Sequence, residues 1–169
     1  PSENIFINNI TCAKSHGLTV GSEVSGGIRN VSFNNIRIFD SGPSVRIKSN
    51  CGRGAYIRDV SYTNISASNV DTAIWIDQQY GKGQPEACNQ TGTTIFENIR
   101  ITNLTADGVK TAFTIVGLKQ DAKSNISIPI EGVFLQDVAV TNYGTLGSCT
   151  NANVSTHRVT PQLPPCART

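Results

Sequence analysis

The sequence predicts an all-β protein built as a parallel β-helix, a solenoid in which successive coils of chain stack on one another. Three observations favour this fold. A nine-residue motif recurs five times along the 169 residues, a second short apolar stretch follows four of the copies, and no segment keeps a long 3.6-residue period. The composition agrees, because glycine, asparagine and β-branched residues are frequent and charged residues make up only 15%.

The repeated motif contains a bend. Its copies read NIFINNITC, NVSFNNIRI, DVSYTNISA, NIRITNLTA and GVFLQDVAV, at residues 4–12, 30–38, 59–67, 98–106 and 132–140. The apolar alternation changes parity across the sixth position, where each copy has Asn or Asp, residues that tolerate unusual backbone angles. Stacking therefore predicts a bend ladder of Asn35, Asn64 and Asn103 beside a buried column of Val31, Val60, Ile99 and Val133.

The stretches GLTVGS, SVRIKS, AIWIDQ and AFTIV give each coil a second strand. Equivalent positions on adjacent coils lie about 4.8 Å apart. The predicted inward rung is Leu18, Val45, Ile74 and Phe113, and its outward neighbours are Thr19, Arg46, Trp75 and Thr114. Arg46 and Lys48 then share one face, where two cations repel unless something negative meets them. That partner is either a substrate or Asp77, which lies beside Lys48 and would form a surface ion pair worth under about 1 kcal/mol.

The repeat sets the organisation of the chain. We expect coils over residues 1–145 and a polar, Pro-containing tail over residues 146–169. An antiparallel β-sandwich is the rival fold, but Asn-Gly and Asp-Gly hairpin turns are scarce. The opening stretch PSENIFINNI has neither an initiating Met nor the pattern of a signal peptide. We therefore expect a solenoid whose N-terminal coils are missing from this sequence.

Composition excludes several function classes. A net charge of +2 is too small to predict binding to nucleic acid or an anionic membrane, and no apolar run approaches the about 18 residues of a membrane span. The five cysteines form no CxxC pair and few histidines lie near them, so we expect no metal site and no cofactor.

The cysteines and glycosylation sequons together favour a secreted protein, extracellular or in a cell wall. We expect a disulfide between Cys149 and Cys166, which bracket the tail. A second candidate pair is Cys51 and Cys88, which follow strands of neighbouring coils. Cys12 is left over, and its partner should lie in the missing upstream segment. There are seven N-x-S/T sequons. Three lie on the bend ladder, where a glycan would disrupt stacking; the expected glycosylation sites are Asn30, Asn89, Asn125 and Asn153.

Two motifs, in order on successive predicted coils, carry a family resemblance. SHGLTVGS at residues 15–22, followed by RIK at 46–48, resembles the polygalacturonases of glycoside hydrolase family 28, and DQQYG at 77–81 matches the place of a family Tyr. The resemblance implies a right-handed parallel β-helix. It also implies that His16 is the active-site His, that Arg46 and Lys48 bind the galacturonate carboxylate, and that Tyr80 lines the substrate groove. Strict alternation from Leu18 would turn His16 inward, so Gly17 must permit a twist that redirects it.

The sequence departs from the family in its carboxylates. The family's catalytic Asp residues lie upstream of the His motif, in an Asn-Thr-Asp stretch and an Asp-Asp pair, and neither occurs here. Glycoside hydrolysis needs one carboxylic acid and one carboxylate. The resemblance thus implies the C-terminal part of a secreted polygalacturonase-like hydrolase that cleaves α-1,4 galacturonosyl bonds of pectin with inversion. Its partners would be acidic galacturonan and the N-terminal part of the same protein.

Two alternatives remain open from the sequence. The first is a catalytically inactive cell-wall solenoid that binds polysaccharide or has a structural role. The second is a pectate lyase, which would need a Ca²⁺ site of clustered acidic residues, and the sequence has no such cluster. Exo or endo cleavage, and homogalacturonan or rhamnogalacturonan as substrate, also stay open.

Overall fold

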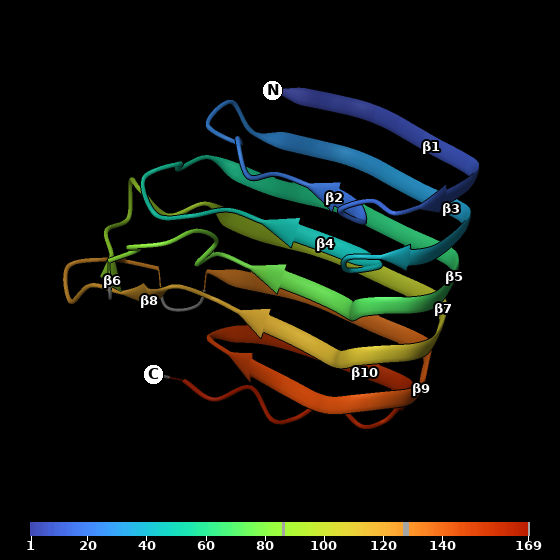
Figure 1. Cartoon of the computed structure of the whole chain (residues 1–169). Helices are drawn as coiled ribbons and strands as arrows, with labels where there is room; N and C mark the ends of the chain where they lie inside the picture. The colour runs from blue at the N-terminus through green and yellow to red at the C-terminus, as the bar shows by residue number, and fades with distance from the viewer. Residues whose placement is uncertain (86, 127–128, 169) are drawn as a thin grey trace.

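Parallel strands stacked in coils make up the computed structural model, which describes residues 1–85, 87–126 and 129–168 (Figure 1). The long strands are β1 (Ser2–Ala13), β3 (Ile28–Ser41), β5 (Tyr56–Asp77), β7 (Ile95–Val116), β9 (Ile130–Thr150) and β10 (Ala152–Thr160), hydrogen-bonded in that order. The short strands are β2 (Leu18–Val20), β4 (Val45–Lys48), β6 (Ala87–Cys88) and β8 (Lys119–Gln120). Every pairing is parallel. The described part has no helix, and hence none that could cross a membrane. The predicted parallel β-helix is confirmed.

The predicted columns lie in the core. Val31, Val60, Ile99 and Val133 are register partners from β3 to β9, and all four side chains are buried. The rung of Leu18, Val45, Ile74 and Phe113 is likewise stacked and buried. On the third and fourth coils the two predicted strands merge into one bent strand, β5 or β7, because Ser68, Val70 and Thr72, which lie between them on β5, keep register partners on β7.

The bend ladder is confirmed. Asn9, Asn35, Asn64, Asn103 and Asp137 all have positive φ, between 54° and 59°, a conformation in which Asn and Asp are enriched. Their side chains connect the coils: the Asn35 amide donates to Asn9 Oδ1 over 3.1 Å, and the Asn103 amide to Asn64 Oδ1 over 2.8 Å. The Asn64 amide donates instead to Asn34 Oδ1 over 3.2 Å, so hydrogen bonds join the bend residues of two pairs of adjacent coils, and the positive φ recurs at the bend of all five.

A second ladder, not predicted, opens each copy of the repeat. Asn4, Asn30, Asp59 and Asn98 also have positive φ. The Asn30 amide donates to Asn4 Oδ1 over 2.6 Å. Asn30 is exposed, as expected for a glycosylation site. It nevertheless belongs to a ladder, like Asn9, Asn64 and Asn103, which the sequence argument excluded as glycosylation sites because they lie on one.

The solenoid continues past residue 145, where the sequence placed its end. β9 runs to Thr150, and β10 stacks on it with Val154 opposite Val133 and Val159 opposite Val138. Only the last part of the expected tail lacks a long strand, and its final residue, Thr169, lies outside the described residues. The tail bends back so that the backbone N–H of Asn151 donates to the carbonyl of Ala167 over 2.8 Å. The predicted Cys149–Cys166 disulfide holds it there.

Candidate active site

Three stacked strand segments present the outward face on which the site lies. β2, β4 and the end of β5 pair in the predicted register, so Thr19, Arg46 and Trp75 stand in one outward row. Lys48 and Asp77 are register partners two residues further along. The buried rung beneath them makes this face rigid, because each outward side chain is flanked by core residues on its own strand.

Arg46 is the centre of the site. Only 8% of its surface is exposed, and its guanidinium carbon lies 4.6 Å from the ring centroid of Trp75 and 5.2 Å from that of Tyr80. Its Nε finds no hydrogen-bond partner among the described residues, and no described carboxylate forms a salt bridge with it. A buried cation normally has a charged or hydrogen-bonding partner. Aromatic faces therefore offset the charge of Arg46 only in part, and its N–H groups remain able to bind an anion.

Lys48 and Asp77 do not form the ion pair that the sequence left open, although both side chains are described. The Lys48 ammonium lies 4.0 Å from the centroid of the Tyr80 ring. The Asp77 carboxylate instead accepts hydrogen bonds from the backbone N–H of Gln79, over 2.6 Å, and from the indole N–H of Trp75, over 3.3 Å. Burial raises the pKa of Asp77, and these two hydrogen bonds oppose that rise. The surface-ion-pair explanation of the two cations is therefore wrong.

Tyr80 reaches both cations from the loop that follows β5. Its backbone N–H donates to the carbonyl of Ser49 over 3.0 Å, which holds the loop against the end of β4. Gln78 anchors the same loop from inside: its amide donates to Thr94 and accepts from Leu118 N–H over 2.9 Å. Together these bonds fix the backbone that carries the tyrosine ring.

The predicted Cys51–Cys88 disulfide is also confirmed, with 5.8 Å between the Cα atoms. It joins the loop after β4 to β6, the short strand that follows the loop carrying Tyr80. The two loops that flank the site are thus covalently linked to each other.

His16 lies on the neighbouring coil, in the turn before β2. Its side chain is exposed, and the predicted twist is present: Gly17 has a φ of +88°. The turn is closed by Thr19, whose hydroxyl donates to the carbonyl of His16 over 2.9 Å. No hydrogen bond or ion pair joins the described side chain of His16 to Arg46 or Lys48. Of the four residues named from the sequence, the structure brings three into contact and places His16 outside that cluster.

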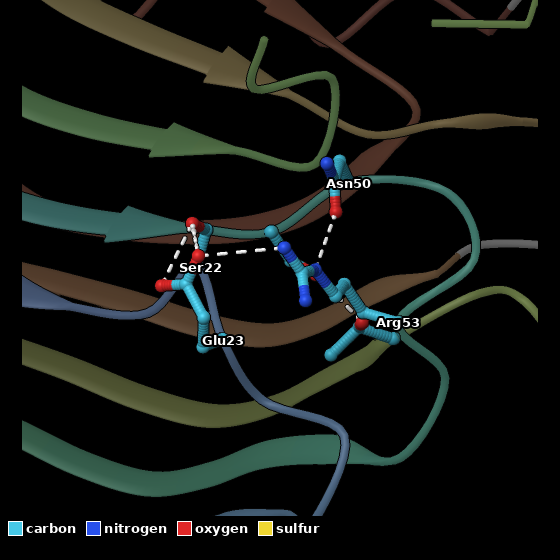
Figure 2. A network of polar contacts seen from close by, with 6 residues as sticks. Ser22, Glu23, Asn50 and Arg53 are labelled. Carbon is cyan, nitrogen blue, oxygen red and sulfur yellow. Dashed lines mark hydrogen bonds and ion pairs between the residues drawn. The ribbon is translucent and has the colours of Figure 1, made fainter.

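A polar network borders the site on the loops after β2 and β4 (Figure 2). The Ser22 hydroxyl donates to the Glu23 carboxylate over 3.1 Å, Arg53 Nη2 lies 3.4 Å from the same oxygen, and Arg53 Nε donates to Asn50 over 3.1 Å. The hydrogen bond from Ser22 is the main cause that lowers the pKa of Glu23. Sequence reasoning missed this network, because its residues lie in loops without a repeat.

Trp75 is the other residue that sequence reasoning left out of the site. Its outward position was predicted, but alternation gives a side chain's face and not its contacts. The available signal was the row of outward neighbours, which put the indole beside Arg46. Among the described residues, no group of three or more His, Cys, Asp or Glu is arranged to hold a metal ion.

Comparisons with known proteins agree with this geometry. The family model of glycosyl hydrolases family 28 matches residues 1–159. Polygalacturonase-2 of Solanum lycopersicum is 29% identical over 171 residues, covering 98% of this chain and 36% of the relative. A probable endopolygalacturonase A of Neosartorya fischeri is 37% identical over 112 residues, covering 63% of this chain and 28% of the relative. The chain spans about a third of the length of the curated relatives it matches.

Proposed function

This chain belongs to the glycosyl hydrolases of family 28, and on that premise we propose that it forms the carboxylate-binding part of a polygalacturonase-like hydrolase. Arg46 and Lys48 bind the carboxylate of a galacturonate unit next to the scissile bond. The observation that carries this proposal is the buried Arg46 guanidinium, which forms no salt bridge with a described carboxylate and whose Nε has no hydrogen-bond partner among the described residues. A guanidinium grips a carboxylate through two parallel hydrogen bonds, while the ammonium of Lys48 adds a point charge.

The reaction is hydrolysis of α-1,4 galacturonosyl bonds with inversion. It requires a carboxylic acid that protonates the leaving oxygen and a carboxylate that activates water, about 6.5–9.5 Å apart. We assign both to a part of the protein outside this sequence. His16, exposed in the turn before β2, orients or supports those carboxylates rather than acting as the main acid.

The first coil supports the assignment of further coils. Within the described residues β1 pairs with β3 alone, and Ile5 and Ile10 remain exposed there. A cavity of about 220 Å³ opens at this end, lined by Ile5, Ile7, Phe33 and others. Apolar core positions of this kind are covered by the neighbouring repeat in a solenoid. Cys12, free in this chain and donating to Ser15 Oγ over 3.2 Å, would pair with a cysteine of the same upstream part.

Secretion into an extracellular space or cell wall is part of the proposal. Two disulfides and exposed sequon asparagines support it. We expect glycans on Asn30, Asn89, Asn125 and Asn153. Peptide mass mapping that found glycan chiefly on Asn9, Asn64 and Asn103 would contradict this assignment.

Two substitutions in the full-length protein test the function. Lys48→Ala should lower polygalacturonate turnover strongly while the melting temperature changes little, because Lys48 forms no ion pair with a described carboxylate. Arg46→Lys should also be harmful, since it keeps the charge but loses the two-bond grip. Lys110→Ala is the matched control: its ammonium pairs with Asp71 at an exposed site of another coil segment. Exposed pairs contribute about 0–1 kcal/mol, so the control should leave both turnover and melting temperature nearly unchanged.

The same assay separates the alternatives. Full turnover with a large loss of stability in Lys48→Ala and Arg46→Lys would mean that the RIK stretch is scaffold. Wild-type protein that binds galacturonan but never cleaves it would identify the inactive polysaccharide-binding solenoid.

A further inference from the structure

Trp75 contacts both the main cation of the site and its nearest carboxylate. Its ring centroid lies 4.6 Å from the Arg46 guanidinium carbon, and its indole N–H donates to Asp77 Oδ2 over 3.3 Å. The side chain is half-buried and stands on β5 directly beside Arg46 of β4. The guanidinium, the ring and the carboxylate thus form a continuous contact across two coils.

Asp77 would be a competitor of the substrate. It is only 8% exposed, it stands two residues after Trp75 on β5 and opposite Lys48 of β4, and its carboxylate is close enough to Arg46 for the guanidinium charge to act on its pKa. Pairs of guanidinium and carboxylate are among the strongest hydrogen-bonded pairs in proteins. An Asp77 turned toward Arg46 would occupy the N–H groups that the galacturonate needs.

The hydrogen bonds of Asp77 explain why that pairing does not form. One carboxylate oxygen accepts from the Gln79 backbone and the other from the Trp75 indole. The backbone bond fixes one oxygen whatever residue stands at position 75. In the described structure the indole N–H is the one donor to the second oxygen. Loss of the indole would therefore free this oxygen to turn toward Arg46.

We propose that Trp75 is a positioning residue that keeps Arg46 available to a uronate carboxylate, by stacking on its guanidinium and by holding Asp77 away from it. The inference rests on the proposed function, in which Arg46 binds that carboxylate. When only a fraction of the protein has a free Arg46, the apparent affinity falls by that fraction. Pairing of Asp77 with Arg46 in about nine molecules of ten would therefore weaken binding about tenfold.

The test uses three variants of the full-length protein: Trp75→Phe, Asp77→Asn and the double variant. Trp75→Phe keeps an aromatic face but removes the N–H, so binding of trigalacturonate should weaken about tenfold and KM should rise with little change in kcat. Asp77→Asn removes the competing charge and should bind as tightly as wild type or more tightly. The double variant should recover to within about threefold of Asp77→Asn, because nothing remains to compete for Arg46. Should Trp75→Phe fail to fold, Trp75→Leu, which also lacks a hydrogen-bond donor, replaces it in the same comparison.

The outcomes distinguish this inference from the proposed function. Fully methyl-esterified trigalacturonate, which lacks the carboxylate charge, is the control ligand. Wild-type protein that binds both ligands equally, or neither, would overturn the carboxylate-binding function itself. Wild-type protein that prefers the free acid, with Trp75→Phe unchanged or with no recovery in the double variant, would overturn the role of Trp75 alone.

Discussion

Replacement of Gly17 by Ala should be far more damaging than the same replacement at Gly52. Both glycines have similar positive φ, +88° and +95°. An added Cβ at Gly17 would lie 1.9 Å from the carbonyl oxygen of Pro43, whereas at Gly52 nothing lies within 4 Å. The two substitutions therefore carry the same energetic cost for a positive φ, and only the one at Gly17 adds a steric clash.

The magnitudes follow from this geometry. Left-handed backbone costs Ala about 1–2 kcal/mol, and the stiffer unfolded chain offsets about 0.4–1 kcal/mol of it. Gly52→Ala should therefore lower the free energy of unfolding by about 1 kcal/mol. At Gly17 the Pro43 carbonyl must also retreat by about 1 Å, and a shift of main chain between two stacked coils should bring the total to about 3 kcal/mol or more.

Thermal unfolding followed by circular dichroism measures the difference. About 1 kcal/mol corresponds to roughly 2–4 °C in a chain of this length. Gly52→Ala should thus lose roughly 2–4 °C and Gly17→Ala at least roughly 6 °C, with a loss of turnover as His16 is displaced. Equal melting temperatures for the two variants would refute the close approach of the coils at Gly17.

Three further predictions concern other parts of the solenoid. Tyr62 is fully buried, and its hydroxyl donates to the carbonyl of Leu18 over 3.1 Å. Tyr62→Phe should therefore lower the free energy of unfolding by about 0.5–1.5 kcal/mol, which urea unfolding would show as a lower midpoint with an unchanged slope. Removing the Cys149–Cys166 bridge by a double change to Ala should cost about 3 kcal/mol, and an unaltered unfolding midpoint would show that the tail is held without it. The hydrogen bond from Arg158 lowers the pKa of Asp137 from 3.8 to about 2. The ionised Asp137 carboxylate therefore contributes to the stability of the fold above about pH 4, and this contribution is lost as the pH falls toward 2. An NMR titration should show this midpoint and its return to the ordinary range in Arg158→Met.

The sequence pattern predicted the stacked features well, because the physics of stacking is local and periodic. Alternation identified the inward rung, and the parity change at Asn35 and its equivalents identified the bend. Register then placed Arg46 beside Trp75 correctly. Contacts between side chains depend on rotamers and on competing donors, and periodicity describes neither. For that reason the register of Lys48 and Asp77 was right while their ion pair was wrong.

The last coil escaped detection for a physical reason. In β10, Arg158 occupies the bend position and Thr156 the fourth position, where earlier copies have Asn or Asp and an apolar residue. Arg158 adopts the same left-handed conformation, with φ of 52°, while its guanidinium pairs with Asp137 of the coil before. An ion pair thus takes the place of the amide hydrogen bond of the ladder, and a search for Asn or Asp does not find it.

The spacing of the repeats has an evolutionary consequence. Differences in coil length fall almost entirely in the connections that leave the site strands: 7 residues after β2, 7 after β4, 17 between β5 and β7, and 13 between β7 and β9. Extending a flexible connection from 7 to 17 residues adds only about 0.8 kcal/mol of closure entropy. Insertions at this corner leave the ladders and the core in register, so the loops around Arg46 and Lys48 can diversify while the scaffold that holds these two residues is inherited unchanged. Loop contacts at the site and the stability of the core can therefore be selected almost independently in this solenoid.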